Sequence, residues 1–493
     1  MSCLVCVSLV VAGTIVVGAP LPASGASPVG GAALDWHQCA RTFRCGSLDV
    51  PIDYARPGAG DLALALVELP ATTAHVVGDL VMNPGGPGAS GVQFLEMASF
   101  PSALRMSFNL VSFDPRGVGE SDPVRCTGAS GIRSLIALDP APQTAAQVAV
   151  VVKAAKAFDQ SCAEHSPSAL LEHVGTLDTV RDLDRIRAAL GQPKLNYLGF
   201  SYGTYLGELY AQDYPSHVRA MVLDGVFDPA LSSSELLEQQ AVGFESDLKD
   251  FFAWCPRDKT CSQELPAGAK TEYQRLFADI AHGDLVVADL PTQYGGTQVV
   301  TLGVATTAVL GSLYSDQTWP YLAGAIAQAM GGNGDGLAVL AYAQEGMMPN
   351  GQFANLIAAG TATSCLDRSY PSGVTAYEEL AQQLAKVAPD FGADAAWSDF
   401  ACAYWPVPSE GRPQVIQARG SPPILVVGST GDPATPYAWA QAVTHQLARA
   451  ELLTRSGPGH TAYFNSKCIE NWVGSYLVTL RLPPAGTVCP STS

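Results

Sequence analysis

The stretch from Leu195 to Pro215, LNYLGFSYGTYLGELYAQDYP, decides the fold of this 493-residue chain. It begins with a short apolar run, passes through Gly-Phe-Ser-Tyr-Gly at residues 199–203, and continues with apolar residues at helical spacing. A G-x-S-x-G pattern between a strand and a helix is typical of a sharp turn that exposes the serine, and its glycines let the two elements approach closely. We therefore expect a strand at Leu195–Phe200, a helix at Tyr202–Tyr214 and a nucleophilic Ser201 between them.

Strands and helices are predicted to alternate on both sides of this stretch. Runs typical of β-strands lie at Leu62–Leu69, His75–Met82, Asn109–Phe113, Arg219–Leu223, Pro422–Gly428 and Glu451–Thr454. Apolar residues at helical spacing from Val180 to Leu190 indicate a helix that ends at Gly191. Alternation of this kind predicts a mostly parallel sheet with helices on both faces. Combined with the serine turn, it predicts an α/β-hydrolase fold.

The alternation stops after Pro229. Mainly helical patterns follow, as at Ser234–Phe252 and Leu322–Met330, and Thr297–Leu302 is one of the few strand-like runs. We therefore expect an inserted, mainly helical cap domain that interrupts the sheet. The expected segments are a signal peptide at 1–26, the first part of the hydrolase core at 27–230, the cap at 231–400, and the C-terminal part of the core at 401–493.

A serine hydroxyl is a weak nucleophile unless a base accepts its proton and a third group orients that base. In the α/β-hydrolase fold the chain order is serine, acid, histidine. Asp432 and His460 each follow a predicted strand, so they lie on loops at the strand ends where open α/β sheets place their active sites. His217, before a strand, and His445, within a predicted helix, fit the role of the base less well. We therefore predict a catalytic triad of Ser201, Asp432 and His460.

A glycine-rich segment, Asn83–Gly88 (NPGGPG), follows the predicted strand that ends at Met82. Glycines let backbone N–H groups approach a substrate oxygen, and loss of one such donor costs about 2.7–4 kcal/mol of transition-state stabilisation. The segment lacks the lysine of a phosphate-binding loop, which argues against a nucleotide site. We predict that the N–H groups of Gly86 and Tyr202 form an oxyanion hole.

The N-terminus carries an apolar run, Leu4–Ala19, without any charge. Its length suits the apolar core of a signal peptide and is short for a membrane span, which needs about 20 residues. Ser24-Gly25-Ala26 fits the small-residue pattern of a cleavage site. No Lys or Arg precedes the run, so either the true start lies upstream or the signal is atypical. The length of the run leaves an uncleaved N-terminal anchor as the alternative. We expect a secreted or cell-envelope-associated protein with no membrane-spanning segment in its mature chain.

The twelve cysteines bear on the compartment. Cys3 and Cys6 would leave with the signal peptide, so 12 − 2 = 10 remain, an even number that suits an oxidising environment. We expect disulfides between sequence neighbours, namely Cys39–Cys45, Cys126–Cys162, Cys255–Cys261, Cys365–Cys402 and Cys468–Cys489. No C-x-x-C or H-x₃-H spacing of the zinc type accompanies these ten cysteines, so we expect no metal and no cofactor.

The charge of the chain limits its partners. Hydrophobic residues make up 47% and charged residues 15% of the sequence, a composition that favours a packed globular protein over a disordered one. The formal net charge is −18. Because a polyanion of this size repels nucleic-acid phosphates and anionic membrane surfaces, we expect no nucleic-acid partner.

Five motifs taken together resemble those of a known family. They are NPGGPGASG (Asn83–Gly91), FDPRGVGESDPV (Phe113–Val124), GFSYGTYLGELYAQDYP (Gly199–Pro215), GDPATP (Gly431–Pro436) and GPGH (Gly457–His460). Over nearly its whole mature length the chain resembles the secreted tripeptidyl aminopeptidases of actinobacteria, which are relatives of the prolyl iminopeptidases. The resemblance implies a capped α/β-hydrolase that releases short peptides from free N-termini. Prolyl iminopeptidases begin their oxyanion motif with His where this chain has Asn, so proline specificity is not implied.

The predicted triad does not by itself separate amide from ester substrates. We therefore expect peptide or ester substrates, with an aminopeptidase as the main hypothesis. A carboxylesterase or lipase acting on envelope or exogenous esters is the alternative. A non-catalytic binding protein on the same scaffold is a third hypothesis, which the intact set of Ser201, Asp432 and His460 disfavours.

An aminopeptidase must recognise a charged α-ammonium group. A cation that enters a partly dry pocket needs a carboxylate partner to offset its desolvation. The first helix of the predicted cap offers Glu235 and Glu238, which lie three residues apart and so face nearly the same side. That helix begins soon after Asp224 and Asp228, near the active-site edge of the sheet. We predict that the two glutamates bind substrate, with a solvated helix face as the alternative.

Overall fold

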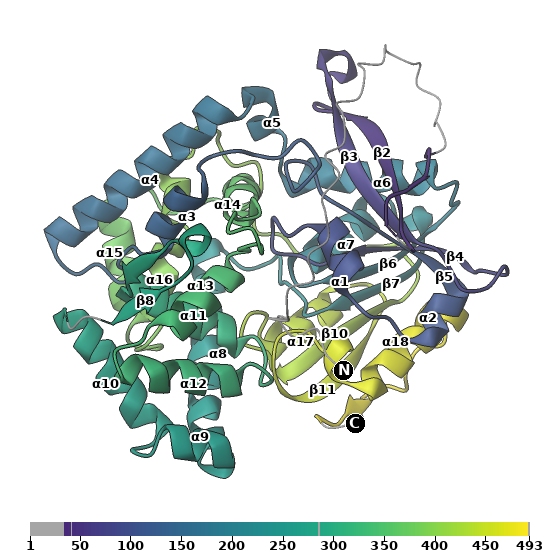
Figure 1. The fold of residues 1–493 in the computed structure, drawn as a ribbon. Coiled ribbons are helices and arrows are strands. Elements are labelled where there is room, and N and C mark those ends of the chain that lie inside the picture. The colour runs from purple at the N-terminus through teal and green to yellow at the C-terminus, as the bar shows by residue number, and fades with distance from the viewer. Residues whose placement is uncertain (1–33, 41, 284–285, 492–493) are drawn as a thin grey trace.

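The computed structural model describes residues 34–40, 42–283 and 286–491 (Figure 1). The predicted signal peptide, with Cys3 and Cys6, lies outside these residues. Within them, disulfides join the pairs predicted from sequence proximity, Cys39–Cys45, Cys126–Cys162, Cys255–Cys261, Cys365–Cys402 and Cys468–Cys489, so that prediction is confirmed. No helix of the described ranges is long and apolar enough to cross a membrane.

One large sheet runs through the core in the order β1-β2-β3-β5-β4-β6-β7-β10-β11-β12. Its strands are β1 (His37–Gln38), β2 (Arg44–Pro51), β3 (Asp61–Leu69), β4 (Gly78–Asn83), β5 (Phe108–Phe113), β6 (Leu195–Phe200), β7 (Val218–Asp224), β10 (Ile424–Gly431), β11 (Ala450–Pro458) and β12 (Val488–Cys489). The pairs β1–β2, β2–β3 and β3–β5 are antiparallel. All other pairs of this sheet are parallel. The predicted α/β-hydrolase fold class is therefore confirmed.

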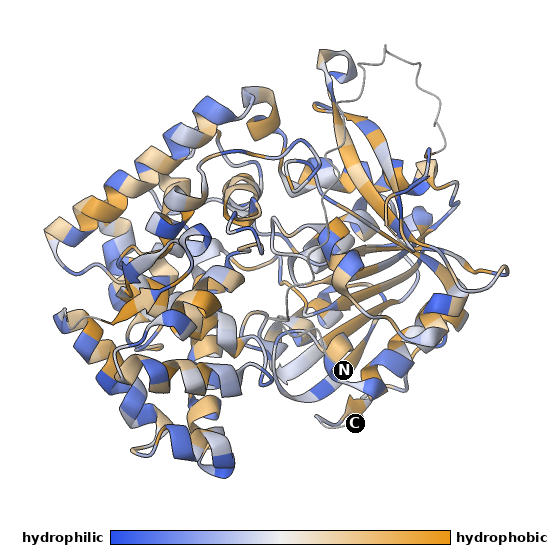
Figure 2. Cartoon of the chain, in the orientation of Figure 1, coloured by the Kyte–Doolittle hydropathy of each residue, from blue (hydrophilic) through white to orange (hydrophobic). Residues whose placement is uncertain are grey.

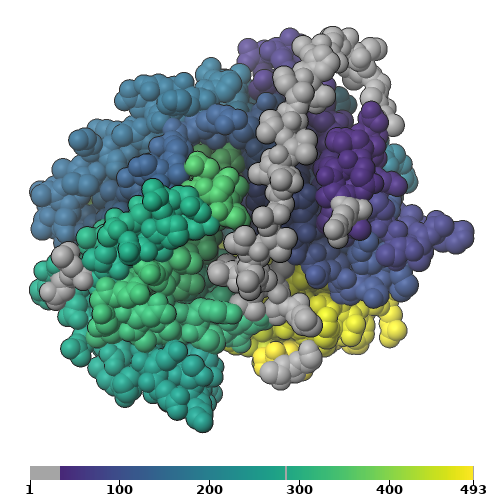
Figure 3. Space-filling model, in the orientation of Figure 1, coloured from purple at the N-terminus to yellow at the C-terminus, as the bar shows by residue number. Residues whose placement is uncertain are grey.

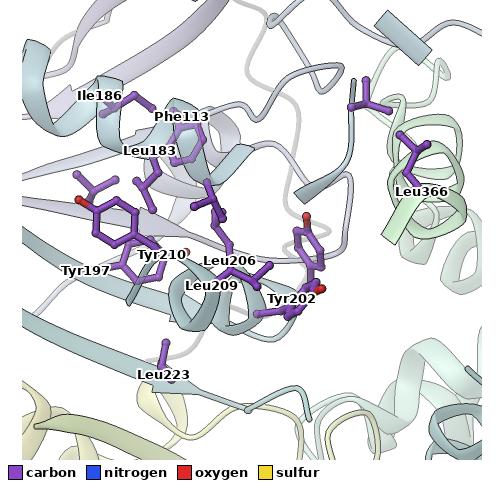
Figure 4. Packing of buried hydrophobic residues seen from close by; sticks show 14 of the residues in the cluster. Phe113, Leu183, Ile186, Tyr197, Tyr202, Leu206, Leu209, Tyr210, Leu223 and Leu366 are labelled. Carbon is purple, nitrogen blue, oxygen red and sulfur yellow. The ribbon is translucent and has the colours of Figure 1, made fainter. Parts of the chain in front are cut away.

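Helices cover both faces of this sheet. On one face lie α6 (Thr176–Ala189), α7 (Tyr202–Asp213) and α17 (Tyr437–Gln446), and on the other α1 (Gly91–Met97), α2 (Ser102–Ser107) and α18 (Lys467–Thr479). Leu206 and Leu209 of α7 and Leu183 of α6 pack against Phe113 and Tyr197 of the sheet (Figure 4). The central strands β4 and β6 are buried along their whole length and mostly apolar (Figure 2), because both of their faces are covered.

A helical cap lies between β7 and β10 in the sequence, although these two strands are hydrogen-bonded neighbours. It comprises α8 (Ser233–Trp254), α9 (Lys259–Glu264), α10 (Ala269–His282), α11 (Leu302–Leu313), α12 (Trp319–Met330), α13 (Asp335–Gln344), α14 (Leu356–Asp367), α15 (Val374–Leu384), α16 (Gly392–Ser398) and a hairpin of β8 (Val287–Asp289) and β9 (Thr297–Val299). Its helices bury their own hydrophobic core, and in Figure 3 they form a mass beside the sheet domain. The strand expected at Thr297–Leu302 is shorter, because Thr301 caps α11 and Leu302 already belongs to that helix.

Three further helices, α3 (Ala129–Ile136), α4 (Ala145–His165) and α5 (Ser168–Glu172), come between β5 and α6. Sequence analysis assigned this region to the core segment at 27–230. In the structure Val148 and Val151 of α4 share a hydrophobic cluster with Tyr377 and Trp397, so α4 packs with cap helices (Figure 1). Helical periodicity reports that a helix has an apolar face but not which domain receives it. The helical layer therefore draws on two separate parts of the chain.

Candidate active site

Ser201 lies in a strained turn between β6 and α7. Its backbone has φ 54° and ψ −129°, a conformation that non-glycine residues rarely adopt. Two glycines make the turn possible, because a Cβ on Gly199 would lie 2.4 Å from the carbonyl oxygen of Gly203, and a Cβ on Gly203 would lie 2.6 Å from that of Asn83. The Ser201 N–H donates to the carbonyl oxygen of Asp224 at 2.9 Å. These close approaches hold the serine at the carboxyl end of the sheet.

Asp432 and His460 come together on the loops after β10 and β11. Nδ1 of His460 donates to the two carboxylate oxygens of Asp432 at 2.9 and 3.1 Å. The carboxylate also accepts the backbone N–H groups of Ala434, Thr435 and Thr461 at 3.1, 2.8 and 3.1 Å. Asp432 is only 4% exposed, so these donors replace water around it. This geometry fixes the imidazole ring and leaves its Nε2 free of Asp432.

Two carboxylates act on the histidine loop. Burial by itself would lower the pKa of His460, but the charge and hydrogen bond of Asp432, with the charge of Asp224, outweigh it and raise that pKa. Asp224 accepts the N–H groups of Ala462 and Tyr463, each at 2.9 Å or less. Burial raises the pKa of Asp224 to about 7. The end of β7 thus holds the segment that follows the histidine.

The glycine-rich segment after β4 lies directly on the serine turn. A Cβ on Gly85 would lie 2.5 Å from the carbonyl oxygen of Phe200 and 3.0 Å from the nitrogen of Tyr202, so only glycine fits there. Asn83 Oδ1 accepts the Gly85 N–H at 2.9 Å and shapes the loop. In the described part of the chain, the N–H groups of Gly86 and Tyr202 donate to no protein acceptor. Both are therefore available to a substrate oxygen.

Ser201, His460 and Gly86 line one cavity of about 710 Å³ between the sheet and the helical layer. Tyr314, at the end of α11, is a cap residue that contacts His460 of the predicted triad. The backbone carbonyl oxygen of Tyr314 accepts the backbone N–H of His460 at 2.8 Å. The Tyr314 ring packs edge-on against the imidazole of His460, with 5.4 Å between ring centroids. Sequence analysis missed Tyr314, since no motif marks it. The cap therefore lines part of the cavity and contacts the predicted base.

The structure does not bring Glu235 and Glu238 to this cavity. Glu235 accepts the N–H and hydroxyl of Ser232 at 2.8 and 2.7 Å, which completes a capping box at the start of α8. Both glutamates are exposed, and neither lines the cavity. Their prediction as substrate ligands is therefore corrected: three-residue spacing placed them on one helix face, but that face points to solvent.

Other acidic residues line the cavity instead. They are Asp139, which precedes α4, Glu345, at the end of α13, and Asp394, in the first turn of α16. Sequence analysis missed all three, because packing of separate helices brings them together. Among the described residues, no group of three or more His, Cys, Asp and Glu side chains is placed to hold a metal ion.

Several known hydrolases are similar in sequence to this chain. The chain is 34% identical to the serine protease Hip1 of Mycobacterium tuberculosis, over 99% of this chain and 96% of that protein. It is 32% identical to the tripeptidyl aminopeptidase of Streptomyces lividans (96% and 89%) and 33% identical to carboxylesterase B of M. tuberculosis (94% and 91%). A family model described as TAP-like protein matches residues 388–489. Among solved structures, the proline iminopeptidase of Mycobacterium smegmatis matches with 13% identity and a TM-score of 0.35, over 87% of this chain and 97% of that one.

The fold and the site define a serine hydrolase of the α/β-hydrolase class. Within that class the chain belongs to the TAP-like family, together with the tripeptidyl aminopeptidases named above. The resemblance inferred from its five sequence motifs is thereby confirmed.

Proposed function

We propose that this chain is a secreted or envelope-associated aminopeptidase that releases short, tripeptide-type N-terminal peptides through an acyl-enzyme on Ser201. The observation that carries the proposal is the cavity shared by Ser201 and His460. Its volume of about 710 Å³ lies within the roughly 300–1,000 Å³ of small-ligand sites. A cavity of this size, lined in part by the cap, suits the end of a peptide chain better than the middle of a folded protein.

In the proposed reaction, Ser201 Oγ attacks the carbonyl carbon of the scissile bond while His460 Nε2 accepts its proton. Asp432 holds the imidazole and stabilises its protonated form. The negative charge that develops on the carbonyl oxygen meets the N–H groups of Gly86 and Tyr202. The protonated histidine then gives its proton to the leaving amine, and water, activated by the same histidine, hydrolyses the acyl-enzyme.

A carboxylesterase is the second candidate function. The same attack and proton transfers cleave an ester, whose alkoxide leaving group is better than an amine. One relative of similar identity carries the name carboxylesterase B. For the compartment, the five disulfides among the described cysteines support an oxidising location.

The test profiles the purified full chain on alanine p-nitroanilides of one, two and three residues, each with a free and an acetylated N-terminus. The proposal expects the free tripeptide anilide to give the highest kcat/KM. Hydrolysis of simple esters without cleavage of any anilide would favour the carboxylesterase. The inactive Ser201→Ala protein is the control for contaminating peptidases.

A further inference from the structure

The cavity that contains Ser201 is acidic. Of its charged lining residues, Asp139, Glu345 and Asp394 are acids, and no lysine or arginine of the described chain lines it. The one basic group of that lining is His460, whose Nδ1 is already held by Asp432. A cavity of this composition favours a cationic ligand over a neutral or anionic one.

Glu345 and Asp394 lack protein partners. Among the described residues, neither carboxyl group accepts a hydrogen bond or forms an ion pair. Asp139, by contrast, accepts the Ala141 N–H at 3.0 Å and Gln147 Nε2 at 2.7 Å. Glu345 and Asp394 are therefore the two acids of the cavity that can bind a ligand without losing an internal bond.

The side chains of Glu345 and Asp394 are partly buried. Burial raises the pKa of Glu345 to about 7. Burial, together with the charge of Glu345, raises the pKa of Asp394 to about 7 as well, so the two groups lie within electrostatic range of each other. Charged carboxylates without partners are unfavourable in such a place, and a bound cation would offset that cost.

The pair lies close to the reaction centre. Tyr314 contacts the ring of His460 and also lines the cavity. Burial and the charges of Glu345 and Asp432 raise the pKa of Tyr314 to about 12, so both acids lie within electrostatic range of this tyrosine. Glu345, Tyr314 and His460 therefore face the same cavity, so a ligand bound at Glu345 shares that cavity with the reaction centre.

We propose that Glu345 and Asp394 together bind the α-ammonium group of the substrate and thereby restrict the enzyme to peptides or esters with a free N-terminus. The inference rests on the proposed function, since it names the substrate class for the Ser201 site. A primary ammonium has three N–H donors, so two carboxylates from different helices can share it. The separation between this pair and Ser201 then sets how many residues the enzyme removes.

The test uses the full chain and two esters, alanyl-alanyl-alanyl p-nitrophenyl ester and its N-acetyl derivative. Esters report on the ammonium site whether or not the enzyme cleaves amides. Glu345→Gln and Asp394→Asn should each lower kcat/KM for the free ester at least about tenfold, mainly through KM. Both variants should change kcat/KM of the acetylated ester less than about twofold, because that substrate has no ammonium to lose.

Glu379→Gln is the matched control, because it removes a carboxylate from an exposed position of α15 outside the cavity. It should leave both esters unaffected. The rate of fluorophosphonate labelling at Ser201 shows whether each variant keeps a working nucleophile. Unchanged kcat/KM for the free ester in both cavity variants overturns the proposal, and so does an equal loss on both esters.

A third substrate, N-acetyl-lysyl-alanyl-alanyl p-nitrophenyl ester, distinguishes the two sources of an ammonium group. If its turnover falls in the two variants while that of the free alanine ester does not, the pair binds a lysine side chain and the proposal is wrong. A wild type that prefers the free ester but cleaves no anilide would keep the ammonium site and remove the peptidase function. Failure of the ammonium site and failure of the peptidase function therefore give different results.

Discussion

The carboxylates of the core and those of the cap differ in the hydrogen bonds that they accept. In the core, Asp432 accepts three backbone N–H groups besides His460, and Asp224 accepts two. In the cap, Glu345 and Asp394 accept none from the described residues. A carboxylate whose donors are built in is organised before the substrate arrives, whereas one without donors gains its partner on binding. We therefore propose that the core supplies the reaction and that the cap supplies the selection of substrate.

The largest effect is expected from removal of the nucleophile, which tests the catalytic role of the core. Ser201→Ala and His460→Ala should each lower kcat on the order of 10⁶-fold, because members of a triad act as a unit. A fluorophosphonate probe should label the wild type and fail on Ser201→Ala. Labelling that survives in the alanine variant would mean that the core does not carry the reaction at Ser201. KM of the residual activity should stay near the wild-type value, since the cap is untouched.

A smaller fall in kcat is expected when Asp432 is replaced. Asp432→Asn should lower kcat on the order of 10⁴-fold, less than loss of the serine, because the oxyanion donors and the nucleophile remain. The amide can still accept the Thr435 N–H, so the fold should persist. The test compares kcat of Asp432→Asn with kcat of Ser201→Ala on the same N-acetylated ester. Equal losses would mean that Asp432 does more than orient the base.

Sequence predicts the core better than the cap for a physical reason. Ser201 needs a positive φ and two flanking glycines, and Gly85 must lie against Tyr202, so these positions leave a readable motif. The β6 strand and the α7 helix follow from the same stretch. Glu345 and Asp394 adopt ordinary helical or near-helical backbone, and only the packing of α13 and α16 brings them to one cavity. Spacing along one helix therefore favoured Glu235 and Glu238, which are exposed.

The pH profile should report the core histidine alone when the substrate has no ammonium. A general base works in its neutral form, so kcat/KM is full above the pKa of His460 and falls tenfold per pH unit below it. Because Asp432 and Asp224 raise that pKa from 6.5, the acid midpoint for an N-acetylated ester should lie above 6.5. Asp432→Asn should move the midpoint to lower pH. A midpoint below 6.5 in the wild type would contradict the raised pKa.

Disulfides offer a comparison of stability between the two regions. Cys126–Cys162 links the segment before α3 to α4, across 36 residues, and Cys468–Cys489 links α18 to β12, across 21 residues. Replacing either pair by serine should lower the free energy of unfolding by about 2–4 kcal/mol, with the longer loop losing more in the chain-entropy account. Denaturant titration measures the loss. Only the Cys126–Cys162 variant should also raise KM, because α4 packs with the cap; a raised KM in both would contradict this.

The smallest effect is expected at the start of α8, where Glu235 caps the helix. Glu235→Ala removes the acceptor of the Ser232 N–H and hydroxyl, so the melting temperature should fall slightly. Glu235→Gln keeps an amide oxygen in the same place and should restore most of that loss. Neither variant should change KM for a free-N-terminus ester, because the side chain is exposed and lies outside the cavity. A selective rise in KM for that ester, with the acetylated ester unaffected, would return the ammonium-binding role to α8 and take it away from Glu345 and Asp394. Thermal unfolding and the two esters together decide between these outcomes, because a helix cap changes the first and an ammonium ligand changes the second.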